Sequence, residues 1–476
     1  MDSTIVDTNS LAVIHEGVGH GYTSYWSTID ERKTRQGLPT GSACDDIFNM
    51  NSSSGWRISA RLRLLSLGDQ ALFSASNFVI TIAIARLFPS DDLAAYGIGM
   101  TIAVTAQQLQ RSTFVVPITL LNSARFYRRR AGLIAQNIVL FGFASSIVVL
   151  TFAILMLSNT VHTQAYIYAS VSCTAIYFSV DFDRVLLLKS GRQATPFTLS
   201  LCYFFTTIGL AILAFLQAIS FSDILLVQAL FGVVKTSTIA SLTAWPSFHK
   251  AIKLLMHNFR ANFGWAAICT LSSIGYSDLP LFILAASGSA LATAAYVAVR
   301  SPLQPMLIVV RSLDIVDKVR FGNVTRMSVG DASERFWRLL RQYFLGSVTF
   351  ATIAAIYSRP LINLFIGPKY LQFGLTLSLW AAIFVVATTL LPLETIIYRE
   401  KRIRAFAFVQ VIAGIIGGCA SIPLSYYFST PGAVSACLLG WVVVIFASWV
   451  FIVRPLVGSG TGVSEDGLPQ RFPPMW

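Results

Sequence analysis

Residues 405–453 read AFAFVQVIAGIIGGCASIPLSYYFSTPGAVSACLLGWVVVIFASWVFIV and contain no charged side chain. A helix that crosses a bilayer needs about 20 consecutive apolar residues, so this stretch is long enough for two crossings. The Ser-Thr-Pro-Gly sequence at 429–432 separates the two apolar halves, and proline and glycine are typical of turns. The stretch therefore predicts two membrane helices, 405–428 and 432–453, joined by a tight turn.

The same apolar character extends through the whole chain. Of its 476 residues, 55% are hydrophobic and 12% are charged, and the mean hydropathy is +0.66. A soluble domain carries about 25% charged residues, so the composition excludes a disordered protein, a nucleic-acid-binding domain and an ordinary cytosolic enzyme. We predict an all-α, polytopic membrane protein of about twelve spans. The other ten predicted spans are 68–88, 94–122, 131–158, 163–180, 194–217, 221–244, 262–285, 290–312, 339–357 and 371–397.

The lysines and arginines set the expected orientation. The net charge is +13, and 29 of the 35 lysines and arginines fall in segments that would face the cytoplasm. The segments that would lie outside hold only Arg359 and Lys369. Because cytoplasmic loops collect Lys and Arg, we expect an even number of spans in the cytoplasmic membrane, with both termini in the cytoplasm.

The predicted spans form two six-helix lobes, 68–244 and 262–453, around a central cavity. Each lobe begins inside, so the lobes should be parallel repeats. A weak internal echo at an offset of 200 matches Ala94-Ala95-Tyr96 to Ala294-Ala295-Tyr296. We expect residues 1–67 to form a disordered cytoplasmic tail and residues 454–476 a second cytoplasmic tail.

The linker between the lobes, 245–261, has its own pattern. Apolar and basic residues recur on opposite faces, which is typical of a helix that lies on the inner leaflet. The apolar face includes Trp245, Phe248 and Ile252, and the basic face His249, Lys250 and Lys253. The simpler interpretation is that this helix tethers the lobes, and the alternative is that it recruits a lipid substrate.

Charges within the spans provide the candidate site residues. A charge at the centre of a span costs roughly 2.5–3.5 kcal/mol on insertion scales, so such residues should face a cavity or a partner. Arg300 is the strongest candidate, because Pro302 and Pro305 should break its helix near the midplane. The predicted substrate-binding residues are Arg300, Arg111, Lys235, Arg86, Gln107 and Asn77, although Arg86 lies near an outer end and can snorkel.

Two acids within the spans, Asp278 and Glu394, are candidate sites for ion coupling, and Asp278 could instead pair with a cavity arginine. Asp181-Phe-Asp183 imitates a sugar-nucleotide motif, but we interpret it as a charge pair at a helix end. Gly414 and Gly418 form a GxxxG pattern, which favours close helix packing. We expect no metal site, no cofactor and no catalytic residue.

Several short motifs resemble Wzx-type polysaccharide flippases of the multidrug/oligosaccharidyl-lipid/polysaccharide exporter superfamily. These motifs are Asp69-Gln70-Ala71-Leu72-Phe73-Ser74-Ala75-Ser76-Asn77-Phe78, Ala85-Arg86-Leu87-Phe88, Ala94-Ala95-Tyr96, Leu109-Gln110-Arg111 and Ala298-Val299-Arg300. The resemblance implies twelve helices in two lobes and the translocation of a polyprenyl-diphosphate-linked saccharide by alternating access. The implied partners are the lipid-linked saccharide, membrane lipid, a polysaccharide polymerase and glycosyltransferases, with no nucleic acid.

Intramembrane arginines suit this function, because guanidinium groups can neutralise a diphosphate with charge-assisted bonds. The first alternative is a cation-coupled multidrug exporter of the same superfamily. It would need acidic cavity residues, whereas the spans hold more basic than acidic residues. The second alternative is a membrane glycosyltransferase or polymerase, which usually needs a large outer loop. The predicted outer loops are mostly about five residues long, so we expect a transporter and not an enzyme.

Overall fold

The computed structural model describes residues 53–115, 118, 123–156, 163–190, 192, 194–243, 245–306, 310, 329–399 and 402–455. Every regular element within these residues is a helix, which confirms the all-α prediction. Residues Met1–Leu64 and Leu65–Trp476 form separate units. In the first unit only the beginning of one helix is described, so the architecture below is that of the second unit.

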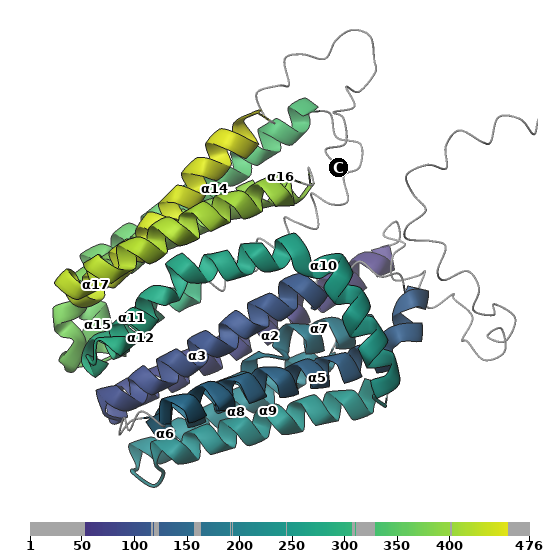
Figure 1. Cartoon of the computed structure of the whole chain (residues 1–476), viewed down its shortest axis with the longest axis horizontal. Coiled ribbons are helices and arrows are strands. Elements are labelled where there is room, and N and C mark those ends of the chain that lie inside the picture. The colour runs from purple at the N-terminus through teal and green to yellow at the C-terminus, as the bar shows by residue number, and fades with distance from the viewer. Residues whose placement is uncertain are drawn as a thin grey trace, which may run out of the picture. The chain divides into compact units, whose positions relative to one another are not determined.

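The helices of the predicted first lobe, 68–244, are drawn in purple to teal in Figure 1, and they share a buried apolar core with helices of the predicted second lobe. Their ranges overlap every predicted span between 68 and 244. They are α2 (Ser53–Leu87), α3 (Ser90–Gln110), η2 (Arg111–Val115), α5 (Ser123–Met156), α6 (Thr163–Tyr177), α7 (Val180–Lys189), α8 (Ala194–Phe215) and α9 (Phe221–Thr243).

The helices of the second lobe likewise occupy every predicted span from 262 to 453. They are α10 (Phe248–Ser277), α11 (Leu279–Ala286), α12 (Ala290–Ala298), η3 (Ser301–Leu303), α14 (Val329–Ile356), α15 (Ser358–Phe365), η4 (Pro368–Phe373), α16 (Gly374–Arg399), α17 (Ile403–Ser448) and η5 (Trp449–Val453). Six helices of the described chain are long and apolar enough to cross a membrane, or seven when the bent pair α10–α11 counts as one span.

Two boundaries differ from the expected ones, and a third agrees. The linker helix and the start of the seventh span form one continuous helix, α10, and the break comes later, at Asp278, with a bend of 43°. Helix α2 begins at Ser53, inside the expected tail, because residues 53–67 lack proline and contain several strong helix formers. The predicted turn at 429–432 is confirmed, because α17 consists of two helices that meet at Ser429, whose φ of 53° and ψ of −131° are non-helical.

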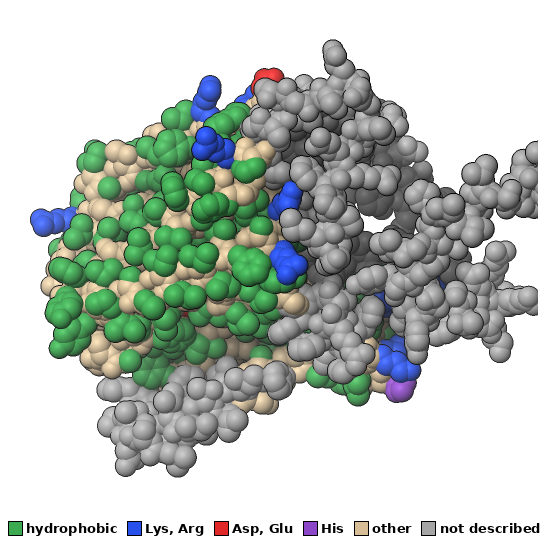
Figure 2. Space-filling view, turned by 45° about the horizontal axis from the view of Figure 1, so that its top comes forward, with side chains coloured by type: hydrophobic (Ala, Val, Ile, Leu, Met, Phe, Trp, Pro, Cys, Tyr) green, Lys and Arg blue, Asp and Glu red, His purple; other side chains and the backbone are tan. Residues whose placement is uncertain are grey.

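The surface and the core agree with a membrane environment. Figure 2 shows a face covered largely by hydrophobic side chains, with lysines and arginines toward its margins.

Where the lobes meet, α3 packs against α12. A Cβ atom at Gly97 would lie 2.3 Å from Cγ2 of Val297, so only glycine permits this approach. The two segments matched by the internal echo, 94–96 and 294–296, are fully or almost fully buried in the same core.

Candidate functional site

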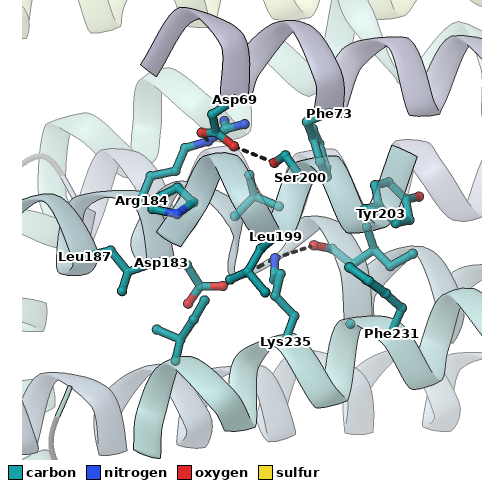
Figure 3. A pocket seen from close by; sticks show the side chains of 15 residues that line it. Asp69, Phe73, Asp183, Arg184, Leu187, Leu199, Ser200, Tyr203, Phe231 and Lys235 are labelled. Atoms are coloured by element: carbon teal, nitrogen blue, oxygen red, sulfur yellow. Dashed lines mark hydrogen bonds and ion pairs between the residues drawn. The ribbon is translucent and has the colours of Figure 1, made fainter. Parts of the chain in front are cut away.

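A cluster of charged side chains lies inside the first lobe, between α2, α7, α8 and α9 (Figure 3). Asp69 on α2 accepts hydrogen bonds from Nε of Arg184, at 2.6 Å, and from the hydroxyl of Ser200. Nζ of Lys235 lies 3.3 Å from Oδ2 of Asp183. We call these five residues the N-lobe ion cluster.

Local structure explains why the acids gather there. Asp181 and Asp183 lie in the first turn of α7, where the positive end of the helix dipole favours carboxylates. Asp181 is 3.7 Å from Arg184 and 3.7 Å from Arg111, which begins the π-helical turn η2. The expected charge pair at a helix end is therefore present, but it belongs to a network that joins α7 to α3, α2 and α9.

The N-lobe ion cluster is largely shielded from solvent. The exposed fractions of the side chains are 5% for Asp69, 6% for Asp183 and 12% for Lys235. A buried pair of this kind is strongly sensitive to loss of either partner, because the remaining charge is left without compensation.

A cavity of about 30 Å³ adjoins the cluster and is closed on the apolar side by Phe73, Tyr203 and Phe231. Nη2 of Arg184 is buried without a hydrogen-bond partner among the described residues, and the buried Oδ2 of Asp183 contacts the amine of Lys235. A space of this size holds one or two water molecules. The site can therefore hold water, or a small cation beside the carboxylates.

A second polar site lies where the lobes meet. The hydroxyl of Thr105 on α3 donates a hydrogen bond of 2.9 Å to Oδ2 of Asp278, at the α10–α11 break. Arg300 follows the end of α12, so its helix breaks where Pro302 and Pro305 predict it. Its guanidinium lies 5.7 Å from the ring centre of Trp380, which is a cation–π contact.

Asp278 and Arg300 interact electrostatically but are not in ion-pair contact within the described chain. Tyr296 connects their surroundings, since its hydroxyl donates to the carbonyl of Ser277, at 3.1 Å, and its ring packs edge-on against Trp380. This leaves the positive charge of Arg300 facing an aromatic ring, with no carboxylate in direct contact.

The remaining predicted site residues are dispersed. The side chain of Arg111 is 61% exposed, whereas Lys235 is buried in its ion pair. Gln107 is half-buried on α3, and Asn77 is buried with its side-chain oxygen lacking a hydrogen-bond partner. Glu394 is half-buried on α16 and lies within electrostatic range of Cys269.

Arg86 lies at a contact between the predicted lobes, at the end of α2 that the predicted topology places outside. Its guanidinium donates to the carbonyls of Asn363 and Phe365, both at 3.0 Å, and to that of Leu364. In the opposite direction, Nζ of Lys369 donates to the carbonyl of Phe88, at 2.9 Å. Each lobe thus caps the end of a helix in the other lobe, and we call this reciprocal contact the outer latch.

Sequence reasoning missed Asp69, Asp183 and Arg184 as site residues. These residues lie toward the predicted inner ends of spans, where charges are expected for reasons of topology alone. The sequence did contain a signal, namely acidic residues at the inner ends of spans. The rule that cytoplasmic segments collect Lys and Arg explains only the basic residues there. Among the described residues, no group of three or more His, Cys, Asp or Glu is placed to hold a metal ion.

No protein-family model and no curated protein matches the chain. The chain is similar to solved structures. One is the inward-facing conformation of a multidrug resistance MATE family transporter of the MOP superfamily, with a TM-score of 0.53 and 12% identity, covering 85% of this chain and 96% of that one. Another is a MATE in complex with MaD5, with a TM-score of 0.50 and 12% identity, covering 84% and 96%.

This likeness extends over nearly the full length of both structures. The chain therefore has the polytopic all-α fold of these MATE transporter structures. The superfamily is the one that the short motifs resemble, but the similar structures are MATE transporters and not Wzx flippases.

Proposed function

We propose that the protein is a cation-coupled exporter that works by alternating access, as a MATE-type multidrug exporter would. The observation that carries this proposal is the N-lobe ion cluster, in which buried carboxylates face a small cavity. The similar structure with the higher TM-score is described as a multidrug resistance transporter in an inward-facing conformation.

The arrangement of the lobes agrees with an inward-facing state. The outer latch joins α2 to α15 and to the segment that follows it. In Figure 1, α14, α16 and α17 diverge from the helices of the first lobe toward the end where α10 begins. With the predicted topology, that end faces the cytoplasm, from which an exporter takes up its substrate.

The physical basis of coupling is the balance of charge between Asp183 and Lys235. A proton or small cation at the carboxylate removes the partner of Lys235, and breaking a buried pair costs about 3–5 kcal/mol. A difference of about 5.5 kcal/mol between two states moves their ratio from 1:99 to 99:1. Binding of a proton or small cation at the N-lobe ion cluster therefore changes the free energy enough to alter the preferred arrangement of α2, α7 and α9.

The ion pairs also correct the charge argument made from the sequence. The spans contain an excess of basic residues, which favoured an anionic substrate. In the structure Arg111 and Lys235 face Asp181 and Asp183, so two of the basic residues counted in that excess are neutralised within the first lobe. The balance removes the objection to a cation-coupled drug exporter.

The test is export of a lipophilic organic cation dye from proteoliposomes that carry a proton or sodium gradient. We expect gradient-driven export by the native chain and loss of gradient dependence in Asp183→Asn. The matched control is Asp223→Asn, which removes an exposed acid at the start of α9 that bonds only locally to Ser220. Gradient-driven export by Asp183→Asn at the native rate would contradict the coupling role.

A second candidate function is translocation of a lipid-linked saccharide, and Arg300 is the observation that favours it. Within the described chain its guanidinium contacts the ring of Trp380 and no carboxylate, so a diphosphate could bind there through charge-assisted bonds. The motif resemblance points to the same substrate, and the implied partners are a polysaccharide polymerase and glycosyltransferases.

This second candidate has its own test, in a deletion strain complemented at matched expression. We expect Arg300→Ala to insert normally and to leave lipid-linked saccharide on the inner leaflet. Arg300→Lys should rescue only partly, because an ammonium cannot form the planar two-bond fork. Normal polysaccharide export by Arg300→Ala, together with dye export by the native chain, would leave the drug exporter as the function.

A further inference from the structure

The first two turns of α10 are fixed against α5. The backbone N–H of Ser247 donates to the carbonyl of Ala131, at 3.0 Å. A Cβ atom at Gly132 would lie 2.7 Å from Cδ1 of Leu254 and 2.8 Å from Cβ of Lys250, so the two helices touch there. Ala251 and Leu254 are consequently buried, at 1% and 7% exposure. Because α5 covers the face of α10 that carries Ala251 and Leu254, only the remaining faces of this helix can contact lipid or solvent.

The available face has two different sectors. At about 100° per residue, Phe248 and Ile252 fall on one side of the buried stripe, and Lys250 and Lys253 on the other. Phe248 and Ile252 are 54% and 64% exposed, and Trp245, just before the helix, is 82% exposed. His249, Lys250 and Lys253 are also exposed. An exposed apolar sector beside a basic sector is the pattern of a helix at the headgroup boundary of a membrane.

Helix α5 adds positive charge beside the same surface. Arg128 is exposed one helical turn before Gly132, and Arg130 stacks over the ring of Tyr127, at 5.4 Å. Within the described chain no ion pair to a carboxylate is found for Arg128, Lys250 or Lys253. Their charge contrasts with that of the N-lobe ion cluster, where each cation has an acid.

We propose that this surface binds an anionic phospholipid of the inner leaflet. The headgroup phosphate lies against Arg128, Lys250 and Lys253, and the acyl chains lie along Trp245, Phe248 and Ile252. Hereafter these six residues are the α5–α10 basic surface. Basic residues on an amphipathic helix at the cytoplasmic side are typical of recognition of anionic lipid.

Because of where the α5–α10 basic surface lies, a lipid bound to it should affect the arrangement of the two lobes. Helix α10 contacts α5 in the first lobe and runs on to pack against α17 in the second. A Cβ atom at Gly275 of α10 would lie 2.6 Å from the carbonyl oxygen of Gly414, so that contact is tight as well. A lipid that holds Arg128 and Lys250 together therefore favours the observed arrangement of the lobes.

The experiment measures lipid binding directly, so it is independent of the proposed transport function. The purified full chain is placed in nanodiscs of phosphatidylcholine, with and without phosphatidylglycerol, and the retained phosphatidylglycerol is counted by native mass spectrometry. We expect Lys250→Gln/Lys253→Gln to lose affinity by about fivefold for each lysine. The matched control is Arg341→Gln/Arg454→Gln, which removes two exposed cations from α14 and from the residue after η5.

Two outcomes would overturn the proposal. Equal loss in the variant and the control would mean that the lipid responds to total charge and not to this surface. Full displacement of phosphatidylglycerol by soluble glycerol phosphate would mean that the surface binds a free phosphate, with no contribution from the apolar sector. Retention by the control, loss by the variant and further loss in Phe248→Ser would support it.

Discussion

At the scale of single residues, the charge of Lys235 has the most consequence. The sequence predicted that the amine of Lys235 faces a cavity and binds an anionic substrate. In the structure the amine forms an ion pair with Asp183, 3.3 Å away. Which acid meets which base depends on which helices are neighbours, and hydropathy carries no information on that. Arg300 is the opposite case, because the two prolines beside it mark a helix break that sequence alone could locate.

Lys235→Met should lower the free energy of unfolding by about 3–5 kcal/mol, because it leaves Asp183 buried and uncompensated. Asp183→Leu should destabilise in the same way, and the double variant should recover much of the loss, since a buried pair can be replaced by apolar residues at little cost. Thermal or denaturant unfolding in detergent measures the cycle. Additive losses in the double variant would show that the two side chains do not depend on each other.

At the scale of secondary-structure elements, sequence and structure agree on where helices lie and on the breaks beside Arg300 and at Ser429, and they differ at the start of α10. Hydropathy indicates apolar length, so all twelve predicted ranges contain helix. It does not indicate that α10 continues through the predicted linker, because a basic amphipathic turn and an apolar turn are both compatible with one helix. The GxxxG prediction is confirmed as close packing, since Gly414 lies against the backbone of Ser272.

Gly414→Val should destabilise the contact between α10 and α17. A Cβ atom there would lie 2.4 Å from the carbonyl oxygen of Ser272, so backbone must move. Overpacking of this kind costs about 1–3 kcal/mol, visible as a lower unfolding temperature in detergent. Gly346→Val is the matched control, because a Cβ atom at Gly346 of α14 meets nothing within 4 Å. Equal effects of the two variants would mean that helix propensity alone, and not packing, sets the loss.

The outer latch belongs to the same scale. Hydrogen bonds to charged groups contribute about 1.5–3 kcal/mol, so Arg86→Gln/Lys369→Gln should raise the outward-open population by tenfold or more. Spin labels at Pro89 and Gln372, which are exposed on either side of the latch, report the separation as a distance distribution. Arg359→Gln removes a nearby exposed cation and should leave the distribution unchanged. An unchanged distribution in the double variant would show that apolar packing alone holds the closure.

At the scale of the whole molecule, the fold is shared with MATE transporters at only 12% identity. Length, hydropathy and helix packing were enough to predict an all-α polytopic protein, because those properties tolerate extensive substitution. The candidate site was predicted less well, because Arg184 is indistinguishable in sequence from the basic residues that only set topology, and the sequence does not show that Asp69 is its partner. The short motifs resemble the superfamily to which the structurally similar proteins belong, and they do not separate its members.

The orientation of the chain remains a prediction, which reporter fusions check. Fusions near Asn159, Ser287 and Thr430 should report outside, and fusions near Arg129 and Arg402 inside, because most lysines and arginines lie in the segments assigned to the cytoplasm. An inside signal at Ser287 would contradict the two-lobe topology.

A chain that begins at Met50 should also insert and function, and its failure would show that residues 1–49 have a role.

The outer latch has a consequence for a cell whose surroundings vary in acidity. Its acceptors are main-chain carbonyl oxygens, which carry no titratable proton. Within the described chain its hydrogen bonds involve no carboxylate and no imidazole, the groups that titrate as a medium becomes acid. With the predicted topology, a shift of the medium toward acid therefore leaves the latch closed, so the barrier against leakage of solutes into the cell does not weaken when the driving force for proton entry is greatest.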